Sequence, residues 1–178
     1  FCFLIVGGSQ GAKIFDELIK DVMLDISKKY SIKVIQQTSR ENIDNLKKFY
    51  DTKNIENKIF DFDEKFCDLI NFSDLCITRA GASSLAEMSL LNKPFIAIPL
   101  PSAKDDHQLK NANFYKNKGC CWVLDQKTLN QEKLLEILLK ILNDKSELTD
   151  KKINLKKLNY NNSWLDINQK LIKLIDEN

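Results

Sequence analysis

Residues 1–26 have the sequence FCFLIVGGSQGAKIFDELIKDVMLDI, which joins an apolar run, a glycine-rich loop and a segment of helical period. Ile14, Leu18, Val22 and Ile26 recur every fourth residue, the spacing of one buried helical stripe. Short apolar runs and helical segments keep alternating along the chain, which is typical of βα units around a parallel sheet. The expected strands are Cys2–Val6, Ile32–Gln36, Lys58–Phe62, Leu75–Thr78, Phe95–Ile98 and Cys121–Leu124. The sequence therefore predicts an α/β fold: an open, Rossmann-like parallel sheet of about six strands with helices on both faces.

The length of 178 residues fits one domain. We expect a sheet core over about residues 1–143 and a helical tail over about 144–178, with helices at 145–157 and 163–176 and Ser163 as the second N-cap. The apolar stripe of the last helix packs either on this sheet or across a domain boundary. A lysine cluster at 151–157 is either a solvated face or a contact to anionic lipid. Because the chain starts at Phe1, we expect it to be truncated at its N-terminus.

Composition excludes several classes of protein. The formal charge of +2 gives no field that would hold nucleic acid, and the apolar runs are far shorter than the roughly 20 residues of a membrane-spanning helix. The five cysteines form no Cys-x-x-Cys pair and the chain has one histidine, so we expect neither zinc nor a disulfide framework. Four of the cysteines lie in apolar surroundings and are expected in the core. We expect no cofactor and no resident metal.

The first candidate site is the loop after the first expected strand. Glycines let the backbone turn sharply and approach a ligand, and the helix that follows directs N–H groups and its positive dipole end to the same place. The loop lacks the Gly-Lys-Ser/Thr of a Walker motif and the Gly-x-Gly-x-x-Gly of a dinucleotide site. It is either a diphosphate cradle or an ordinary turn with Ser9 as N-cap. The candidate residues are Gly7, Gly8, Ser9, Gln10 and Gly11.

The second candidate site follows the expected strand 75–78 and has the sequence RAGASSLAE at 79–87. Gly81 frees the backbone before a helix, and Glu87 shares a helical face with Ser83 and Ser84. A carboxylate there can accept hydrogen bonds from both hydroxyls of a ribose, or it can reach back to cap first-turn N–H groups.

The third candidate site follows the expected strand 95–98. Ser102 and Asp105 have the spacing of a capping box, and His107, Gln108 and Asn111 share one face of the next helix. These side chains either bind a sugar's hydroxyls or are unremarkable surface groups.

Four motifs in this order resemble the C-terminal, donor-binding half of the MurG family of peptidoglycan glycosyltransferases. They are GGSQGA at 7–12, RAGASSLAE at 79–87, KPFIAIPLP at 93–101 and DHQLKNA at 106–112. Order and spacing agree over roughly residues 1–125. The resemblance implies one half of a two-domain GT-B fold, in which this whole chain, 1–178, is the nucleotide-sugar donor-binding domain.

The resemblance also implies roles for single residues. Ser9 and the backbone of 7–11 would contact the diphosphate, and Glu87 the ribose hydroxyls. Gln108 and Asn111 would read the sugar, beside His107. Asp63 belongs to the turn 62–64 whose backbone would read uracil. The implied ribose and phosphate wall comprises Ala82, Ser83, Ser84, Leu85, Ala86 and Glu87, and Arg79 and Gly81 just before it are also candidate binding residues.

The family moves N-acetylglucosamine from UDP-N-acetylglucosamine to the 4-hydroxyl of the muramyl sugar on a polyprenyl diphosphate, lipid I to lipid II, with inversion. The resemblance thus implies a peripheral protein of peptidoglycan synthesis, and so of cell wall biogenesis, cell shape and cell division, at the cytoplasmic face of the inner membrane. The family's acceptor half has no counterpart in these residues, so the partner would be an acceptor domain that also binds the lipid-linked acceptor. The catalytic base would lie there, and this chain alone would be inactive.

Two alternatives stay open at this point. One is a nucleotide-sugar-binding subunit of a split N-acetylglucosaminyltransferase, as in the two-subunit transferase of dolichol-linked glycan assembly. The other is a sugar-nucleotide hydrolase or epimerase on the same half-fold, which would need further acids or bases in the cleft.

Overall fold

A computed structural model describes residues 1–8, 13–160 and 172–173. Of the helix expected over 163–176, only residues 172–173 are described; its N-cap Ser163 and its apolar stripe (Trp164, Ile167, Leu171, Leu174 and Ile175) lie outside the described residues. The strands are β1 (Cys2–Val6), β2 (Lys33–Gln37), β3 (Glu56–Phe60), β4 (Leu75–Thr78), β5 (Phe95–Ala97) and β6 (Cys121–Val123). The α-helices are α1 (Lys13–Ser27), α2 (Ile43–Thr52), α3 (Phe66–Phe72), α4 (Ala82–Leu90), α5 (His107–Asn117), α6 (Gln131–Asn143) and α7 (Ser146–Tyr160). Two 3₁₀ turns, η1 (Arg40–Asn42) and η2 (Lys104–Asp106), precede α2 and α5.

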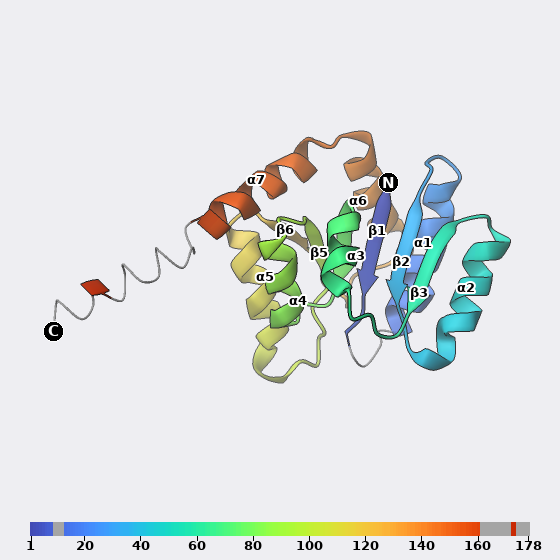
Figure 1. The fold of residues 1–178 in the computed structure, drawn as a ribbon, viewed down its shortest axis with the longest axis horizontal. Helices are drawn as coiled ribbons and strands as arrows, with labels where there is room; N and C mark the ends of the chain where they lie inside the picture. The colour runs from blue at the N-terminus through green and yellow to red at the C-terminus, as the bar shows by residue number, and fades with distance from the viewer. Residues whose placement is uncertain (9–12, 161–171, 174–178) are drawn as a thin grey trace.

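The six strands form one parallel sheet in the order β3-β2-β1-β4-β5-β6. This confirms the predicted α/β class and places the reversal of strand order between β1 and β4. Figure 1 shows the strand arrows running to the lower edge of the molecule, where their carboxyl ends meet. In open α/β sheets, ligands bind outside the carboxyl ends at such a reversal.

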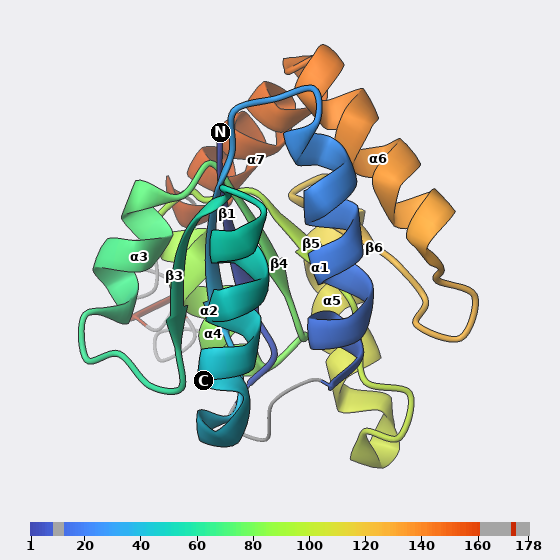
Figure 2. The same cartoon turned by 90° about the vertical axis from the view of Figure 1, so that its right-hand side faces the viewer.

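Helices cover both faces of the sheet, so it is the middle of three layers. One core contains α1, α2 and α6 against side chains such as Phe3 and Ile77, and Figure 2 shows α1 and α6 on the opposite side of the strands from α3. The other core contains α3, α4, α5 and α7 against the alternate residues, such as Leu4 and Cys76. Successive residues of a strand point to opposite faces, which is why one apolar run supplies both cores. All five cysteines are free; Cys67 is exposed and the other four are buried.

The expected bounds were wrong at two places that matter for the site. The third strand was expected at 58–62, but β3 ends at Phe60, because Asp61 Oδ1 then accepts the Phe62 backbone N–H (2.8 Å) and the chain turns away. The capping box of Ser102 and Asp105 was also wrong. A 3₁₀ turn intervenes, Asp105 has a φ of +53°, and α5 begins at His107 without a side-chain cap.

No helix in the part of the chain that the structure describes combines the length and the apolar character needed to cross a bilayer.

Candidate functional site

A crevice of about 730 Å³ opens at the carboxyl edge of the sheet. It lies where three loops, β1–α1, β2–η1 and β3–α3, meet the first two turns of α4. Its lining residues are Val6, Gly8, Gln37, Thr38, Ser39, Arg40, Phe60, Asp61, Phe62, Asp63, Glu64, Phe66, Ser83, Ser84 and Glu87. Two of the three candidate segments predicted from the sequence therefore contribute to one crevice.

From the first loop, the structure describes Gly7 and Gly8, while Ser9, Gln10 and Gly11 lie outside the described residues. Gly8 has a φ of +83°, the left-handed region that glycine adopts without steric cost. Its N–H donates to Gln37 Oε1 at 3.2 Å. Gly8 thus has the backbone conformation that the expected sharp turn after β1 would use.

Helix α4 brings Ser83, Ser84 and Glu87 to the crevice on one face, as their spacing indicated. The capping alternative for Glu87 was wrong: Gly81 is the N-cap, and α4 has no side-chain cap. The first-turn N–H groups of α4 therefore lack a side-chain partner among the described residues. Gly81 has an ordinary φ of −65°, and an added Cβ would meet no atom within 4 Å, so the turn does not require a glycine there.

The remaining residues of the second motif do not line the crevice. Leu85 is fully buried in the core, so its side chain cannot reach a ligand. Ala82 and Ala86 are exposed beside the lining residues. Arg79 is 9% exposed and donates through Nη1 to the Ile98 carbonyl (3.0 Å) and to Gln126 Oε1 (2.6 Å). Its guanidinium lies 4.8 Å from the centroid of the Phe15 ring, and burial lowers its pKa. Arg79 thus joins the end of β4 to neighbouring elements.

The β3–α3 turn contributes Asp61, Phe62, Asp63 and Glu64 to the crevice, and two hydrogen bonds hold Asp63 in place. Lys58 Nζ donates to Asp63 Oδ2 at 2.6 Å and the Lys65 backbone N–H to Oδ1 at 2.8 Å. The hydrogen bond from Lys58 is the main reason that the pKa of Asp63 is lowered. Phe62, 76% exposed, and the half-buried Phe66 add apolar surface to this wall. Because β3 ends at Phe60, Asp61 and Asp63 belong to the turn, and strand alternation does not bring their two carboxylates to one side, where they could bind a metal ion as a pair.

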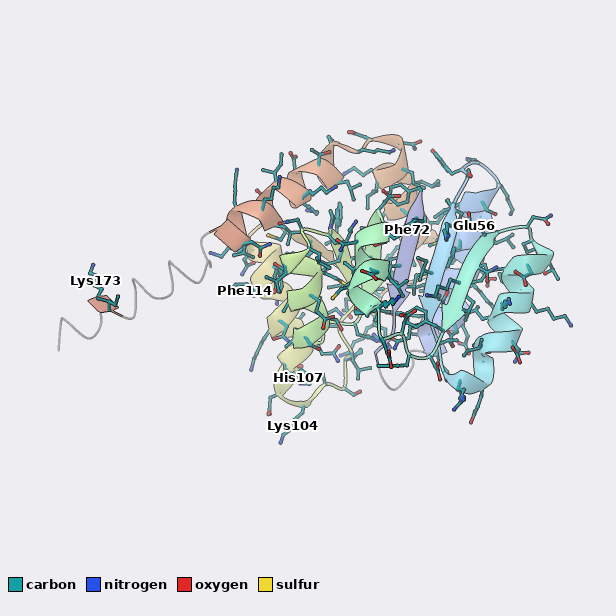
Figure 3. All side chains as sticks on the ribbon, in the orientation of Figure 1. Glu56, Phe72, Lys104, His107, Phe114 and Lys173 are labelled. Carbon is teal, nitrogen blue, oxygen red and sulfur yellow. The ribbon has the colours of Figure 1, made fainter. Side chains whose placement is uncertain are left out.

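The third motif lies at the same edge of the sheet but outside the lining of this crevice. Gln108 Oε1 accepts the backbone N–H groups of Ala80 (3.3 Å) and Leu100 (2.9 Å), and Asn111 Nδ2 donates to the Ala80 carbonyl (3.1 Å). These contacts leave Gln108 Nε2 and Asn111 Oδ1 without a partner among the described residues. His107 is exposed beside Lys104 at the lower end of α5 (Figure 3), and its Nδ1 lies 2.8 Å from the Lys104 carbonyl.

Sequence reasoning missed the β2–η1 wall, formed by Gln37, Thr38, Ser39 and Arg40. The available signal was the polar run QQTSR at 36–40, which begins in the last two residues of β2 at the ligand edge of the sheet. The lining contains four carboxylates, on Asp61, Asp63, Glu64 and Glu87, and one cationic side chain, on Arg40. Positive potential for an anion must therefore come mainly from backbone N–H groups and helix N-termini.

Residues 2–163 match the model of the glycosyltransferase family 28 C-terminal domain. The chain belongs to glycosyltransferase family 28. Among its family 28 relatives, a protein of Pelagibacter ubique is 47% identical over 175 residues, which are 98% of this chain and 49% of that protein. A protein of Rickettsia felis is 35% identical over 160 residues, 88% of this chain and 44% of that protein. Both are named UDP-N-acetylglucosamine--N-acetylmuramyl-(pentapeptide) pyrophosphoryl-undecaprenol N-acetylglucosamine transferase.

The fold matches the crystal structure of MurG from Acinetobacter baumannii with a TM-score of 0.80 and 26% identity. The match covers all of this chain and 52% of that one. The chain thus spans about half the length of the family 28 relatives that it matches.

Proposed function

We propose that this chain is the donor-binding half of an inverting N-acetylglucosaminyltransferase and that its crevice binds the UDP portion of UDP-N-acetylglucosamine. The observation that carries the proposal is the meeting of Gly8, Ser83, Ser84 and Glu87 at one crevice beside the reversal of strand order. The names of the family 28 relatives support this choice of sugar nucleotide and of acceptor.

The diphosphate would lie between the β1–α1 loop and the N-terminus of α4. Gly8 adopts a conformation that permits close approach of a ligand to the backbone, and the uncapped first turn of α4 supplies free N–H groups and the positive end of a dipole. Ser83 and Ser84 add hydroxyl donors at the same place. As the glycosidic bond breaks, negative charge grows on the departing UDP, and these fixed donors stabilise it. No step in this scheme needs a metal ion.

The nucleoside would extend along α4 to the β3–α3 turn. Glu87 faces the crevice without a hydrogen bond or ion pair among the described residues, so its carboxylate is free to accept from both ribose hydroxyls. Phe62 and Phe66 offer apolar surface to the uracil ring, and the turn held by Asp63 offers backbone groups to its polar edge. Gln108 Nε2 and Asn111 Oδ1 remain candidates for the hydroxyls of the sugar.

Transfer requires an acceptor hydroxyl held opposite the departing UDP and a base that takes its proton. The crevice lies along one edge of a single sheet, and we propose that a second domain supplies the acceptor site and the base. With a pyrophosphoryl-undecaprenol acceptor, the enzyme would work as a peripheral protein at the cytoplasmic face of the inner membrane, in peptidoglycan synthesis.

The test combines calorimetry with a transfer assay. UDP-N-acetylglucosamine should bind the purified chain, whereas ADP- and GDP-sugars should bind far more weakly. Formation of the disaccharide lipid should be absent with the chain alone and should require an acceptor domain, fused or added separately. Absence of UDP-N-acetylglucosamine binding by the folded chain, or equal binding of all three nucleotides, contradicts the proposed function.

A further inference from the structure

Gln37 links two walls of the crevice that are distant in sequence. Its Oε1 accepts the Gly8 backbone N–H at 3.2 Å, and its Nε2 donates to the Asp61 carbonyl at 3.0 Å. Gly8 begins the loop assigned above to the diphosphate, and Asp61 begins the turn assigned above to the uracil ring. One amide, at the end of β2, therefore contacts both loops.

We propose that Gln37 is a positioning residue that fixes the spacing between the diphosphate loop, which begins at Gly8, and the uracil-binding turn, which begins at Asp61. This inference rests on the proposed function. The half-buried Gln37 side chain uses both ends of its amide on backbone atoms of the two flanking loops, while the side chain itself stands in the crevice lining. A ligand that touches both loops needs their spacing to be set beforehand, because otherwise binding has to order them.

A second set of contacts anchors the segment that carries Gln37. The buried Thr38 donates through Oγ1 to Asp16 Oδ2 at 2.6 Å, and the same carboxylate accepts from Gln36 Nε2 (3.0 Å) and Asn42 Nδ2 (3.0 Å). Gln36 is fully buried and accepts from the Tyr50 hydroxyl at 2.8 Å. Asp16 lies in the first turn of α1. The β2–η1 segment is thus fastened to the chain on both sides of residues 9–12, to Gly8 before them and to Asp16 after them.

A positioning role for Gln37 predicts different effects on the binding of UDP and of uridine. UDP contacts both loops, whereas uridine reaches only the turn and the ribose side of α4. Loss of the Gln37 amide should therefore weaken UDP more than uridine. One ordinary hydrogen bond changes an equilibrium by roughly 2- to 12-fold, so with two bonds lost we expect UDP affinity to fall by about fivefold or more and uridine affinity by about twofold or less.

The test uses Gln37→Met, which keeps the length of the side chain and removes both hydrogen bonds. The matched control is Gln131→Met on α6, where the amide bonds Asp25 at 3.0 Å, far from the crevice. Gln37→Asn, one methylene shorter and unable to span both loops, is the second variant and decides the test should Gln37→Met not fold. Titrations with UDP and uridine are followed by NMR, and hydrogen exchange of the Gly8 amide is measured without ligand.

We expect the preference for UDP over uridine to fall at least about 2.5-fold in Gln37→Met and in the same direction in Gln37→Asn, with faster exchange at Gly8 in the free protein, and no change in Gln131→Met. The exchange readout separates positioning from direct ligand contact, because a residue that only touched the ligand would leave Gly8 exchange unchanged. An unchanged preference or unchanged Gly8 exchange overturns the inference while the proposed function stands. Absence of UDP binding by the unaltered chain overturns both.

Discussion

Replacement of Glu87 by alanine tests the ribose contact. The carboxylate faces the crevice and has no hydrogen bond or ion pair among the described residues, and it caps nothing in α4. Removing it should leave the helix intact, because alanine favours helix slightly more than glutamate does. The free energy of unfolding should therefore stay within about 0.5 kcal/mol of the parent value.

The expected loss in binding follows from the same geometry. A hydrogen bond to a charged group contributes about 1.5–3 kcal/mol, and a carboxylate across two ribose hydroxyls can make two. Glu87 is half-buried, so part of the free energy of these two hydrogen bonds is offset by the loss of water from the carboxylate. We therefore expect about 1.5–3 kcal/mol for the two bonds together. The Kd for UDP should rise by about 10- to 150-fold.

Calorimetry with UDP and 2′-deoxy-UDP measures this effect and assigns it to the ribose. The parent chain should prefer UDP, and Glu87→Ala should lose most of that preference, because the two changes remove the same contact. Glu136→Ala, on the exposed side of α6, is the matched control and should bind both ligands like the parent. Unchanged UDP affinity in a folded Glu87→Ala chain would refute the ribose role.

Three further outcomes follow from the structure. UDP-N-acetylglucosamine binding should survive EDTA, since Asp61 and Asp63 already accept backbone N–H groups and Asp63 pairs with a lysine; loss of binding that Mg²⁺ or Mn²⁺ restores would contradict this. Arg79→Met should lower the Tm by about 2–12 °C in calorimetry, because it leaves the Ile98 carbonyl unpaired at a cost of about 1–3 kcal/mol; an unchanged Tm would show that the contact is not needed. At pH 8, iodoacetamide should modify Cys67 first by mass spectrometry, since burial raises the pKa of the other four thiols and keeps the reactive thiolate scarce; equal labelling of all five would count against the core.

The fold was predictable because local pattern and topology rules act together. A short, continuously apolar run such as Cys2–Val6, followed by a segment of helical period, is typical of a parallel strand between helices, and right-handed crossovers then bring all carboxyl ends to one edge. Strand ends were less predictable. The bounds of β3 depend on its register with β2, which pairs Gln37 with Phe60, and on turn hydrogen bonds that begin at Asp61. The alternation of apolar residues in the sequence predicts neither the register with β2 nor the hydrogen bonds of the turn.

The candidate site was predictable where spacing on one helix decides the geometry, as for Ser83, Ser84 and Glu87. It was not predictable where contacts join residues far apart in sequence. Gln37 is 29 residues from Gly8 and 24 from Asp61, and nothing in a polar loop tells which amide makes such contacts. Gln108 likewise uses its carbonyl oxygen on backbone N–H groups 28 and 8 residues away.

The most direct test of the donor-binding claim is a titration of the ¹⁵N-labelled chain with UDP-N-acetylglucosamine, followed residue by residue by NMR. We expect saturable shifts concentrated at Gly8, Thr38, Phe62, Ser84 and Glu87, the lining of the crevice. The smaller hollow of about 370 Å³ between α1 and α2, lined in part by Lys20 and Asn45, should stay unperturbed except where it shares Ser39 with the crevice. Shifts concentrated in that hollow, or no saturable shifts at millimolar ligand, would contradict the account.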